Sequence, residues 1–315
     1  MRRSHFLLAT ALAAAALPAA ESQSPIAAVR FSPDGTRLAL AGGEVVRVIA
    51  TAAGAGAAEA RLQTKLAQVM DAAWSPDSTR LAVAGGTAGS AGQVELWDVA
   101  AGRCSRELRL FRDLAYAVAF SPDGKRLAVG GAEGQLRVLD AGSGETAATF
   151  TGHSGPVLCV AWAPDAGEIA SGSGDRSIRI WDAATGKLQR SLNNHAGAVS
   201  AIVYSPDGET LFSASTDGTV RVWVPGVGRM KRIYRGYGSA VLALGYAPAR
   251  RKLVAGVADG SARVVDAETG EIVKRLDPGP EARAAWLHSI AVSGDGAWVA
   301  TADSAGRYRV TRFPE

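Results

Sequence analysis

The stretch from Gly152 to Asp182 reads GHSGPVLCVAWAPDAGEIASGSGDRSIRIWD and contains a complete structural unit. An apolar run over Val157–Trp162 is followed by a Pro-Asp turn and then by a second short run at Glu168–Ser173. A Gly-Asp turn leads to a third run, Ser177–Trp181, in which apolar and polar residues alternate. Short runs bounded by turn residues predict three strands joined by tight turns.

The same unit recurs along the chain. Its marker is an aromatic residue followed by Ser or Ala, Pro and Asp, and the marker decays in the last two copies. The copies start at Phe31, Trp74, Phe120, Trp162, Tyr204, Tyr246 and Val292. A period of about 40–45 residues is typical of the four-stranded blades of a propeller. One blade cannot bury both faces of its small sheet, whereas seven in a ring can. The sequence therefore predicts an all-β, seven-bladed propeller of four-stranded antiparallel blades.

Two copies carry a spaced set of polar residues that resembles the WD-repeat family. In that family a His, a Ser or Thr, an Asp and a Trp form a hydrogen-bonded tetrad within a blade. The matching residues, with steps of 18, 4 and 6 in both copies, are His153, Ser171, Asp175 and Trp181, and His195, Ser213, Asp217 and Trp223. The resemblance implies that these residues are structural, because a buried imidazole bonded to a carboxylate satisfies both groups. The sixth copy keeps the spacing but has Tyr237, Ala255, Asp259 and Val265.

The first 20 residues have the anatomy of a signal peptide. Arg2 and Arg3 precede a 12-residue run rich in Ala and Leu, which Pro18 ends. This run is short for a bilayer span, so we expect cleavage, with retention as an anchor as the alternative; the general secretory and twin-arginine routes both stay open. Residues 21–315 are then expected to form one propeller. Its repeats lie near 26–66, 67–109, 114–150, 152–193, 195–234, 236–276 and 283–313.

Closure of the ring is the unusual point of this chain. The WD-repeat resemblance implies that an N-terminal strand completes the last blade. Counting back from Phe31 by the spacing of the later blades places that strand at 13–19, inside the leader. We therefore expect the closing blade, Trp286–Phe313, to have only three strands or to be completed poorly by Glu21–Pro25.

Charge and motifs argue against several functions. The net charge is +4, and it falls to +2 without Arg2 and Arg3, from 32 basic and 30 acidic residues, which argues against nucleic acid as a partner. The basic cluster of Arg229, Lys231, Arg232 and Arg235 fits an edge strand kept soluble by charge. Zinc-protease, nucleophile-elbow, phosphate-loop and haem-attachment motifs are missing from the sequence. Each Asp has a local role in a turn. We expect no catalytic residues, no metal and no cofactor.

The WD-repeat resemblance implies a non-enzymatic protein-binding scaffold, and the leader places it outside the cytoplasm, in the periplasm or secreted. Partners in this family usually meet the face formed by the links between blades and by the hairpins between second and third strands, called here the tetrad-loop face. Two length anomalies, Gly85–Gly92 and Asp277–Ala285, fall on that face. Aromatic and Arg residues are the favoured contact anchors. The first predicted patch is Arg283, Trp286 and His288, and the second is Arg112, Tyr116 and Tyr237.

Three alternatives stay open. Trp286 would be structural if it packed beneath its own loop. An exported propeller enzyme or small-ligand binder would use the central channel and would need convergent carboxylates or imidazoles at its mouth. The inner-strand runs VLCVAW, AIVYS and VLALGY are instead apolar and small. A structural domain within a larger envelope assembly is the third. We expect a monomeric ring with a protein partner of unknown identity, and no membrane span in the mature protein.

Overall fold

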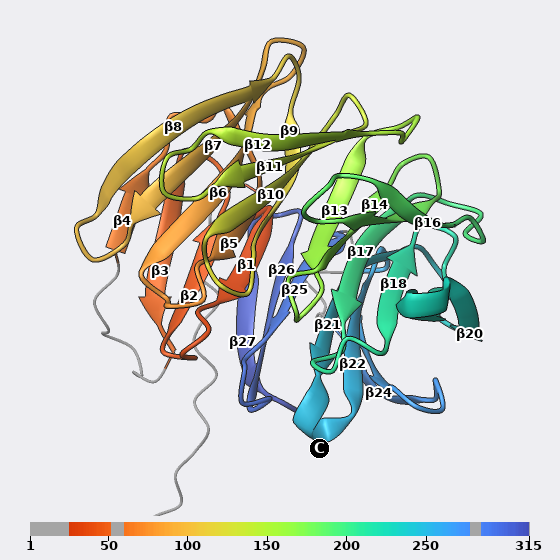
Figure 1. The fold of residues 1–315 in the computed structure, drawn as a ribbon. Coiled ribbons are helices and arrows are strands. Elements are labelled where there is room, and N and C mark those ends of the chain that lie inside the picture. Colours follow the sequence, from red (N-terminus) through yellow and green to blue (C-terminus); the bar gives the residue numbers. More distant parts are fainter. Residues whose placement is uncertain (1–24, 52–59, 278–284, 315) are drawn as a thin grey trace, which may run out of the picture.

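The computed structural model describes residues 25–51, 60–277 and 285–314. These form seven antiparallel sheets placed around a common axis (Figure 1). In every sheet each strand pairs with the next strand of the chain. Six sheets have four strands, and the last has three among the described residues. The prediction of a seven-bladed, all-β propeller with a three-stranded closing blade is confirmed.

The first four blades contain sixteen strands in sequence order. Blade 1 has β1 (Ala28–Phe31), β2 (Arg37–Ala41), β3 (Val45–Ala50) and β4 (Ala60–Gln63). Blade 2 has β5 (Gln68–Trp74), β6 (Arg80–Thr87), β7 (Ala91–Asp98) and β8 (Arg103–Phe111). Blade 3 has β9 (Ala115–Phe120), β10 (Arg126–Gly131), β11 (Gln135–Asp140) and β12 (Thr146–Thr151). Blade 4 has β13 (Val157–Trp162), β14 (Glu168–Ser173), β15 (Ile178–Asp182) and β16 (Leu188–Leu192).

The last three blades continue the same order, with two 3₁₀ turns between strands. Blade 5 has β17 (Val199–Tyr204), β18 (Leu211–Ser215), β19 (Val220–Val224), η1 (Pro225–Val227) and β20 (Arg229–Tyr234). Blade 6 has β21 (Val241–Ala247), η2 (Pro248–Arg250), β22 (Lys252–Val257), β23 (Ala262–Asp266) and β24 (Ile272–Leu276). Blade 7 has β25 (Leu287–Val292), β26 (Trp298–Asp303) and β27 (Tyr308–Arg312).

The ring closes through inner strands. The first strand of each blade packs against the first strands of its neighbours, and β25 packs against β1 in the same way. The Val29 amide donates to Ser289 Oγ at 2.9 Å across this last interface. Apolar residues of blade 1, among them Leu38 and Leu40, share one core with Ala300 and Val310 of blade 7. Closure therefore does not need a fourth strand in blade 7. The other candidate for that strand, Glu21–Pro25, lies outside the described residues apart from Pro25, which is not in a strand.

Close approach between blades requires small residues at one position. Ten residues after each marker, on the second strand, every blade has Ala or Gly: Ala41, Ala84, Gly130, Gly172, Ala214, Gly256 and Ala302. A Cβ on Gly172 would lie 2.6 Å from both Cys159 Sγ and Val199 Cγ1, the latter in the next blade. A Cβ on Gly130 would lie 2.6 Å from Val157 Cγ1 of the next blade. The backbones of adjacent blades are therefore as close as small residues permit.

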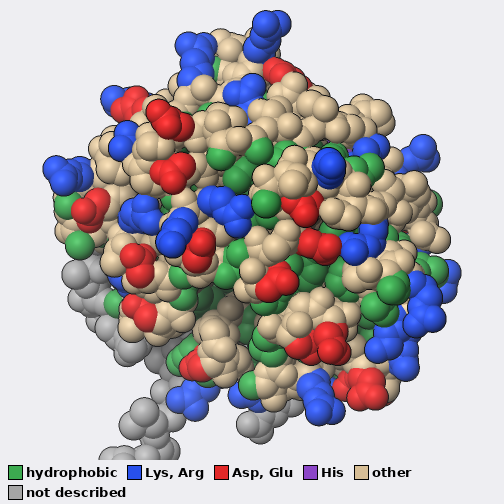
Figure 2. All heavy atoms as spheres, in the orientation of Figure 1, with side chains coloured by type: hydrophobic (Ala, Val, Ile, Leu, Met, Phe, Trp, Pro, Cys, Tyr) green, Lys and Arg blue, Asp and Glu red, His purple; other side chains and the backbone are tan. Residues whose placement is uncertain are grey.

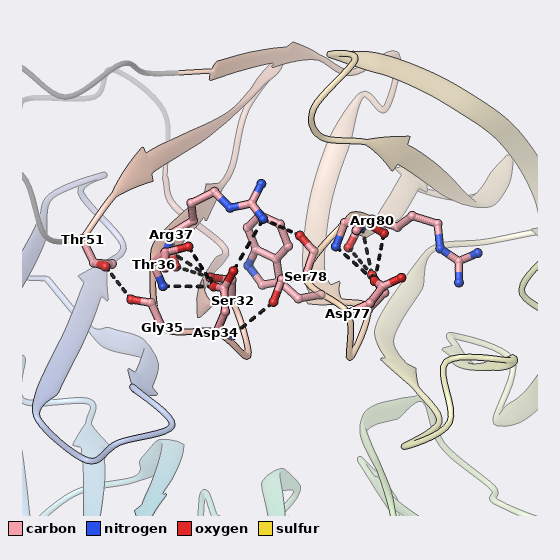
Figure 3. A network of polar contacts seen from close by, with 12 residues as sticks. Ser32, Asp34, Gly35, Thr36, Arg37, Thr51, Asp77, Ser78 and Arg80 are labelled. Carbon is pink, nitrogen blue, oxygen red and sulfur yellow. Dashed lines mark hydrogen bonds and ion pairs between the residues drawn. The ribbon is translucent and has the colours of Figure 1, made fainter.

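Arginines fasten the first four blades on the face opposite the tetrad loops. Arg37 donates to the Ser78 carbonyl of blade 2 at 2.6 Å (Figure 3), and its guanidinium lies 5.0 Å from the ring centre of Trp74. Arg80 likewise reaches blade 3, and Arg126 reaches blade 4. Arg126 donates to two carbonyls, at 3.0 and 3.1 Å, and lies 4.7 Å from the Trp162 ring centre. Each guanidinium thus joins one blade to the aromatic marker and turns of the next.

Both cysteines, Cys104 and Cys159, are free thiols, as their placement on non-adjacent blades predicts. Cys159 is partly buried on its inner strand.

Replacing Gly172 with Val should lower the free energy of unfolding by about 1–3 kcal/mol, because the new side chain overlaps Val199 and Cys159. The matched control is Gly226→Val, where a Cβ would meet no atom within 4 Å. Urea unfolding followed by tryptophan fluorescence measures both. Equal stability of the two variants would contradict the close-approach argument.

Replacing Arg126 with Ala should cost about 2–3 kcal/mol, from one lost cation–π contact and two lost hydrogen bonds. Arg126→Lys should recover only part of this, since an ammonium lacks the planar fork. The exposed neighbour Lys125 serves as the control, and Lys125→Ala should change stability by less than about 0.5 kcal/mol. An Arg126→Ala variant as stable as the control would exclude the fastening role.

Candidate partner-binding face

Blade 4 contains the complete expected tetrad. The Nδ1 atom of His153 lies 2.8 Å from Asp175 Oδ2, and its Nε2 lies 2.8 Å from Ser171 Oγ. The Trp181 indole N–H donates to the same serine oxygen at 2.8 Å. Because the indole can only donate, the serine hydrogen goes to Nε2, and Nδ1–H donates to the carboxylate. With one neutral imidazole, every donor in the tetrad's hydrogen-bond network therefore has an acceptor.

Blade 5 repeats this geometry. His195 Nδ1 lies 2.9 Å from Asp217 Oδ2, its Nε2 lies 2.8 Å from Ser213 Oγ, and Trp223 donates to that oxygen at 2.8 Å. In both blades the carboxylate also accepts a backbone N–H of the incoming loop, from Ser154 in one and from the equivalent alanine in the other. The tetrads therefore position the tetrad-loop face rather than form a reactive site on it.

Protonation follows from burial and from the hydrogen bonds. Burial lowers the pKa of His153 and of His195 below the ordinary 6.5, despite the neighbouring carboxylates. Burial alone would raise the pKa of the Asp175 and Asp217 carboxyls. Hydrogen bonds from a neighbouring hydroxyl and from the imidazole outweigh it and hold each pKa at about 2. The imidazoles are neutral and the carboxylates charged at neutral pH.

Blades 2 and 6 have other residues where blades 4 and 5 have their tetrads. In blade 2 the buried Glu95 accepts the Trp97 indole N–H and the Lys65 amide, both at 2.9 Å. The sequence pattern misses Glu95, because it stands two residues before the tryptophan and not at the tetrad spacing. In blade 6 Tyr237 takes the histidine position and is 1% exposed. Tyr237 therefore packs in the core, and its predicted place in a contact patch is wrong.

Most of the glycine-rich segment of blade 2, Gly85–Gly92, is paired strand. Residues 85, 86 and 87 pair with 93, 92 and 91, so that only residues 88–90 form the tip of the hairpin. The Gly89 amide donates to Asp113 Oδ1 at 2.9 Å, which ties this tip to the start of blade 3. The segment Gly85–Gly92 thus extends a hairpin over its neighbour.

A cleft of about 670 Å³ lies beside this hairpin, between blades 2 and 3. Its lining includes Arg109, Arg112, Arg137 and Glu133, so that three cations surround one carboxylate. Glu133 accepts the Arg112 amide at 2.9 Å, while the Arg112 side chain is exposed. Phe111, at the end of β8, is buried under the Arg137 guanidinium, 4.9 Å from its ring centre. The cleft therefore presents positive charge over an apolar floor.

The second predicted patch is not a single surface. Arg112 lines the cleft, whereas Tyr116 is a half-buried residue of the inner strand β9 and is not among the lining residues. Tyr237 lies in the core between blades 5 and 6. The aromatic character of the two tyrosines suggested contact anchors, but their places in the repeat bury Tyr237 fully and Tyr116 in part. Of this group, only the Arg112 side chain is exposed.

The first predicted patch is divided as well. Trp286 is 61% exposed, and its backbone exchanges two 3.0 Å hydrogen bonds with Ser304, which hold it at the start of β25. The exposed ring does not pack into the core. His288 points elsewhere, since its Nε2 lies 2.6 Å from the Ile26 carbonyl and fastens blade 7 to blade 1. Arg283 lies outside the described residues.

The inner strands offer little polar chemistry. The seven of them carry one carboxylate, Asp71, and one imidazole, that of His288. Asp71 accepts Arg30 of blade 1 at 2.6 Å and the Val118 amide of blade 3 at 3.1 Å, so that it joins three blades. Within the part of the chain that the structure describes, no group of three or more His, Cys, Asp or Glu side chains could hold a metal ion.

Acidic and basic side chains are interspersed over the face seen in Figure 2. Three residues of the basic cluster, Arg229, Lys231 and Arg232, lie on β20, the outermost strand of blade 5, as expected for an edge kept soluble by charge, and Arg235 follows this strand.

Seven antiparallel blades, two of them with buried His-Ser-Asp-Trp tetrads, define a WD-type β-propeller protein. The family model described as IFT122 first beta-propeller matches residues 114–310, more than half of the chain, and the chain belongs to that family. The model described as Lipoprotein LpqB beta-propeller domain matches residues 8–108, so the first part of the chain is similar to that domain. No curated protein matches the chain.

Among residues 25–51, 60–277 and 285–314, no helix has the length and apolar character needed to cross a membrane.

The tetrads predict a loss of stability in mild acid. The unfolded chain takes up protons at His153 and His195 as the pH falls through 6.5, while burial keeps the folded imidazoles neutral. Unfolding therefore binds protons, and the free energy of unfolding should fall by up to about 1.4 kcal/mol per pH unit for each histidine as the pH drops below about 6.5. Urea unfolding across this range measures the slope. A His153→Gln, His195→Gln variant should be less stable and flatter in pH; an unchanged slope would contradict the assignment.

Proposed function

We propose that this protein is a non-enzymatic protein-binding scaffold that acts outside the cytoplasm and meets its partner on the tetrad-loop face. The exposed Trp286 carries this proposal. Large hydrophobic side chains exposed in the described residues are Leu188, Val227, Val273 and Trp286. The first three lie at the start of outer strands or in the turn before one, toward the opposite face. Trp286 lies on the tetrad-loop face, and tryptophan is the residue most enriched at binding hot spots.

The charge on the same face supports a protein partner. Arg112 is exposed and lines a cleft with excess positive charge, and arginine is also enriched at binding hot spots. A partner that inserts an acidic side chain there would be recognised by charge as well as shape. Membership of a propeller family is consistent with this role, although a fold does not by itself determine a function.

The engagement of the polar groups supports a non-enzymatic role. His153 and His195 are bonded on both ring nitrogens, and Asp71 is bonded on both oxygens. A general base or nucleophile needs a free position toward the substrate. The export proposal rests on the leader at residues 1–20 and on the similarity of residues 8–108 to a propeller domain of a lipoprotein. Within this proposal the ring itself is a monomer.

The test is affinity capture of the full chain, tagged at its C-terminus, from envelope extract of its own source. Trp286→Ala should reduce recovery of the partner by about tenfold or more, as expected for a hot spot, while stability changes by less than about 0.5 kcal/mol. Val227→Ala is the matched control, because Val227 is 70% exposed on the opposite face. Recovery unchanged by Trp286→Ala, or lost equally with Val227→Ala, would overturn the proposed face.

Arg112→Ala distinguishes the cleft from the tryptophan within the same capture. A loss additive with that of Trp286→Ala would show two separate contacts on one partner. Fractionation tests the location independently, and full-length protein with an intact leader in the cytoplasm would contradict export.

A further inference from the structure

Strand β27 has one unpaired edge in the described part of the chain. It pairs with β26 on one side, and no described strand lies on its other side. The Asp303 amide donates to the Arg307 carbonyl, and the Phe313 amide donates to the Ala297 carbonyl. Since hydrogen-bonded pairs alternate along an antiparallel ladder, residues 307, 309, 311 and 313 face β26. The backbone groups of Tyr308, Val310 and Arg312 therefore point outward from the sheet.

The repeat shows what belongs opposite this edge. In four complete blades a residue three positions before the tetrad tryptophan position pairs with a large apolar residue of the fourth strand. These pairs are Leu136 with Phe150, Ile178 with Leu192, Val220 with Tyr234 and Ala262 with Leu276. The first member of each pair is at most 2% exposed. The pairing of Arg312 with Trp298 in blade 7 corresponds to that of Asp182 with Glu168 in blade 4. By this register Tyr308 holds the same position in blade 7, but its side chain is only half-buried.

A groove follows the open edge on the side of blade 6. Its volume is about 440 Å³, and blade 6 contributes Ala262 and Leu276 to its wall. Among the described residues, its lining contains five cationic side chains, Lys274, Arg275, Arg307, Arg309 and Arg312, and two carboxylates, Asp277 and Asp303. Arg275 is paired with Asp277 at 2.5 Å, and Arg307 with Asp303 at 2.8 Å. Along β27, Arg309 shares its face with Thr301 toward this groove. Val310 points the other way, into the core shared with blade 1.

We propose that β27 is an acceptor edge for an extended segment of a partner protein, which adds as the fourth strand of blade 7. The segment alternates apolar and acidic residues. Its apolar residues face blade 1, with the largest opposite Tyr308, and its carboxylates face the cationic groove. Backbone hydrogen bonds to the outward groups supply affinity, and the alternation supplies specificity, as in other strand additions. This inference rests on the proposed scaffold function and adds a second contact to it.

The groove disfavours a second copy and the chain's own N-terminal segments as occupants. A second copy of β27 would add its own Arg309 and Arg312 to a lining that already has excess positive charge, which is destabilising. The segment Glu21–Pro25 reads ESQSP and has no large apolar residue to place opposite Tyr308. The segment 13–19 of the chain itself reads AAAALPA, without a carboxylate, and its proline cannot donate to a ladder. A strand with carboxylates on one side and branched apolar residues on the other fits both walls.

The test uses a labelled synthetic peptide, EVEVELE, capped at both ends, with the full chain and fluorescence anisotropy. The leucine falls opposite Tyr308 in the antiparallel register. Arg312→Pro removes an outward N–H and covers the edge without loss of a hydrogen bond to β26. Arg312→Ala is the matched control, because it removes the same charge and keeps the N–H. Proline should weaken binding at least about tenfold, and alanine less than about threefold.

N-methylation of the peptide at its valines and leucine should abolish binding, whereas N-methylation at its glutamates should not, because only the former N–H groups face β27. The charge-reversed peptide KVKVKLK should not bind. Equal binding by Arg312→Pro and Arg312→Ala, or by the two methylated peptides, would overturn the acceptor edge.

Further outcomes separate the occupants and the two proposals. Peptide binding by a chain that begins at Glu21, with none by the full chain, would assign the edge to the leader and overturn the partner segment. A dimer in sedimentation that Arg312→Pro dissociates would assign the edge to a second copy and would likewise overturn the partner segment. If no peptide binds while capture still depends on Trp286, the proposal of an acceptor edge is overturned and the proposed scaffold function is retained. If the peptide binds but no partner is captured, the acceptor edge is retained and the proposed scaffold function is overturned.

Discussion

Close contact between neighbouring sheets is the constraint on which this structure depends. A single blade cannot bury either face of its own sheet. Each interface between neighbouring blades must therefore exclude water from the facing surfaces of both sheets. The sequence meets this demand with Ala or Gly at the same point of all seven second strands, where Gly130 and Gly172 leave no room for a Cβ. Such contact is short-ranged, so a change at one interface disturbs its two blades first. Because the ring is closed and every blade has two neighbours, close packing is needed at all seven interfaces.

Polar fastening varies around the ring while this packing stays constant. Arginines on the face opposite the tetrad loops join blades 1 to 4. Arg250 does the same between blades 6 and 7, where it donates to the Gly296 carbonyl and lies over Phe313. On the tetrad-loop face, tetrads order the loops of blades 4 and 5, and Glu95 has this role in blade 2. These polar contacts fix the orientation of the turns, which the packing of small residues alone would not determine. The variation leaves the tetrad-loop face different from blade to blade.

The sequence was sufficient for the fold because the repeat encodes it in spacing, and spacing survives where chemistry has decayed. The tetrads were readable for the same reason. Burial of Tyr237 was also encoded, since it stands where other blades have the tetrad histidine, but its aromatic character was interpreted as exposure. The arginine contacts had a visible signal, an Arg six residues after the marker in three successive blades. The Arg30–Asp71 pair had none, because it joins different blades at positions that the repeat does not conserve. Contacts within a blade follow from periodicity, whereas contacts between blades require the geometry of the ring.

Closure through β25 and β1 separates two tasks that a fourth strand would otherwise combine. The inner strands hold the ring together with the Ser289 and His288 hydrogen bonds and with the shared apolar core. The outer edge of blade 7 is then not needed for closure, and its backbone groups can pair with another chain without the ring opening. An edge strand of this kind is a hazard for aggregation unless it is protected, and charge is a common protection. Arg309 and Arg312 on β27 place positive charge on both faces of the edge, and Arg309, on the groove side, also attracts a carboxylate-bearing strand. Protection against self-association and recognition of a partner therefore share the side chain of Arg309.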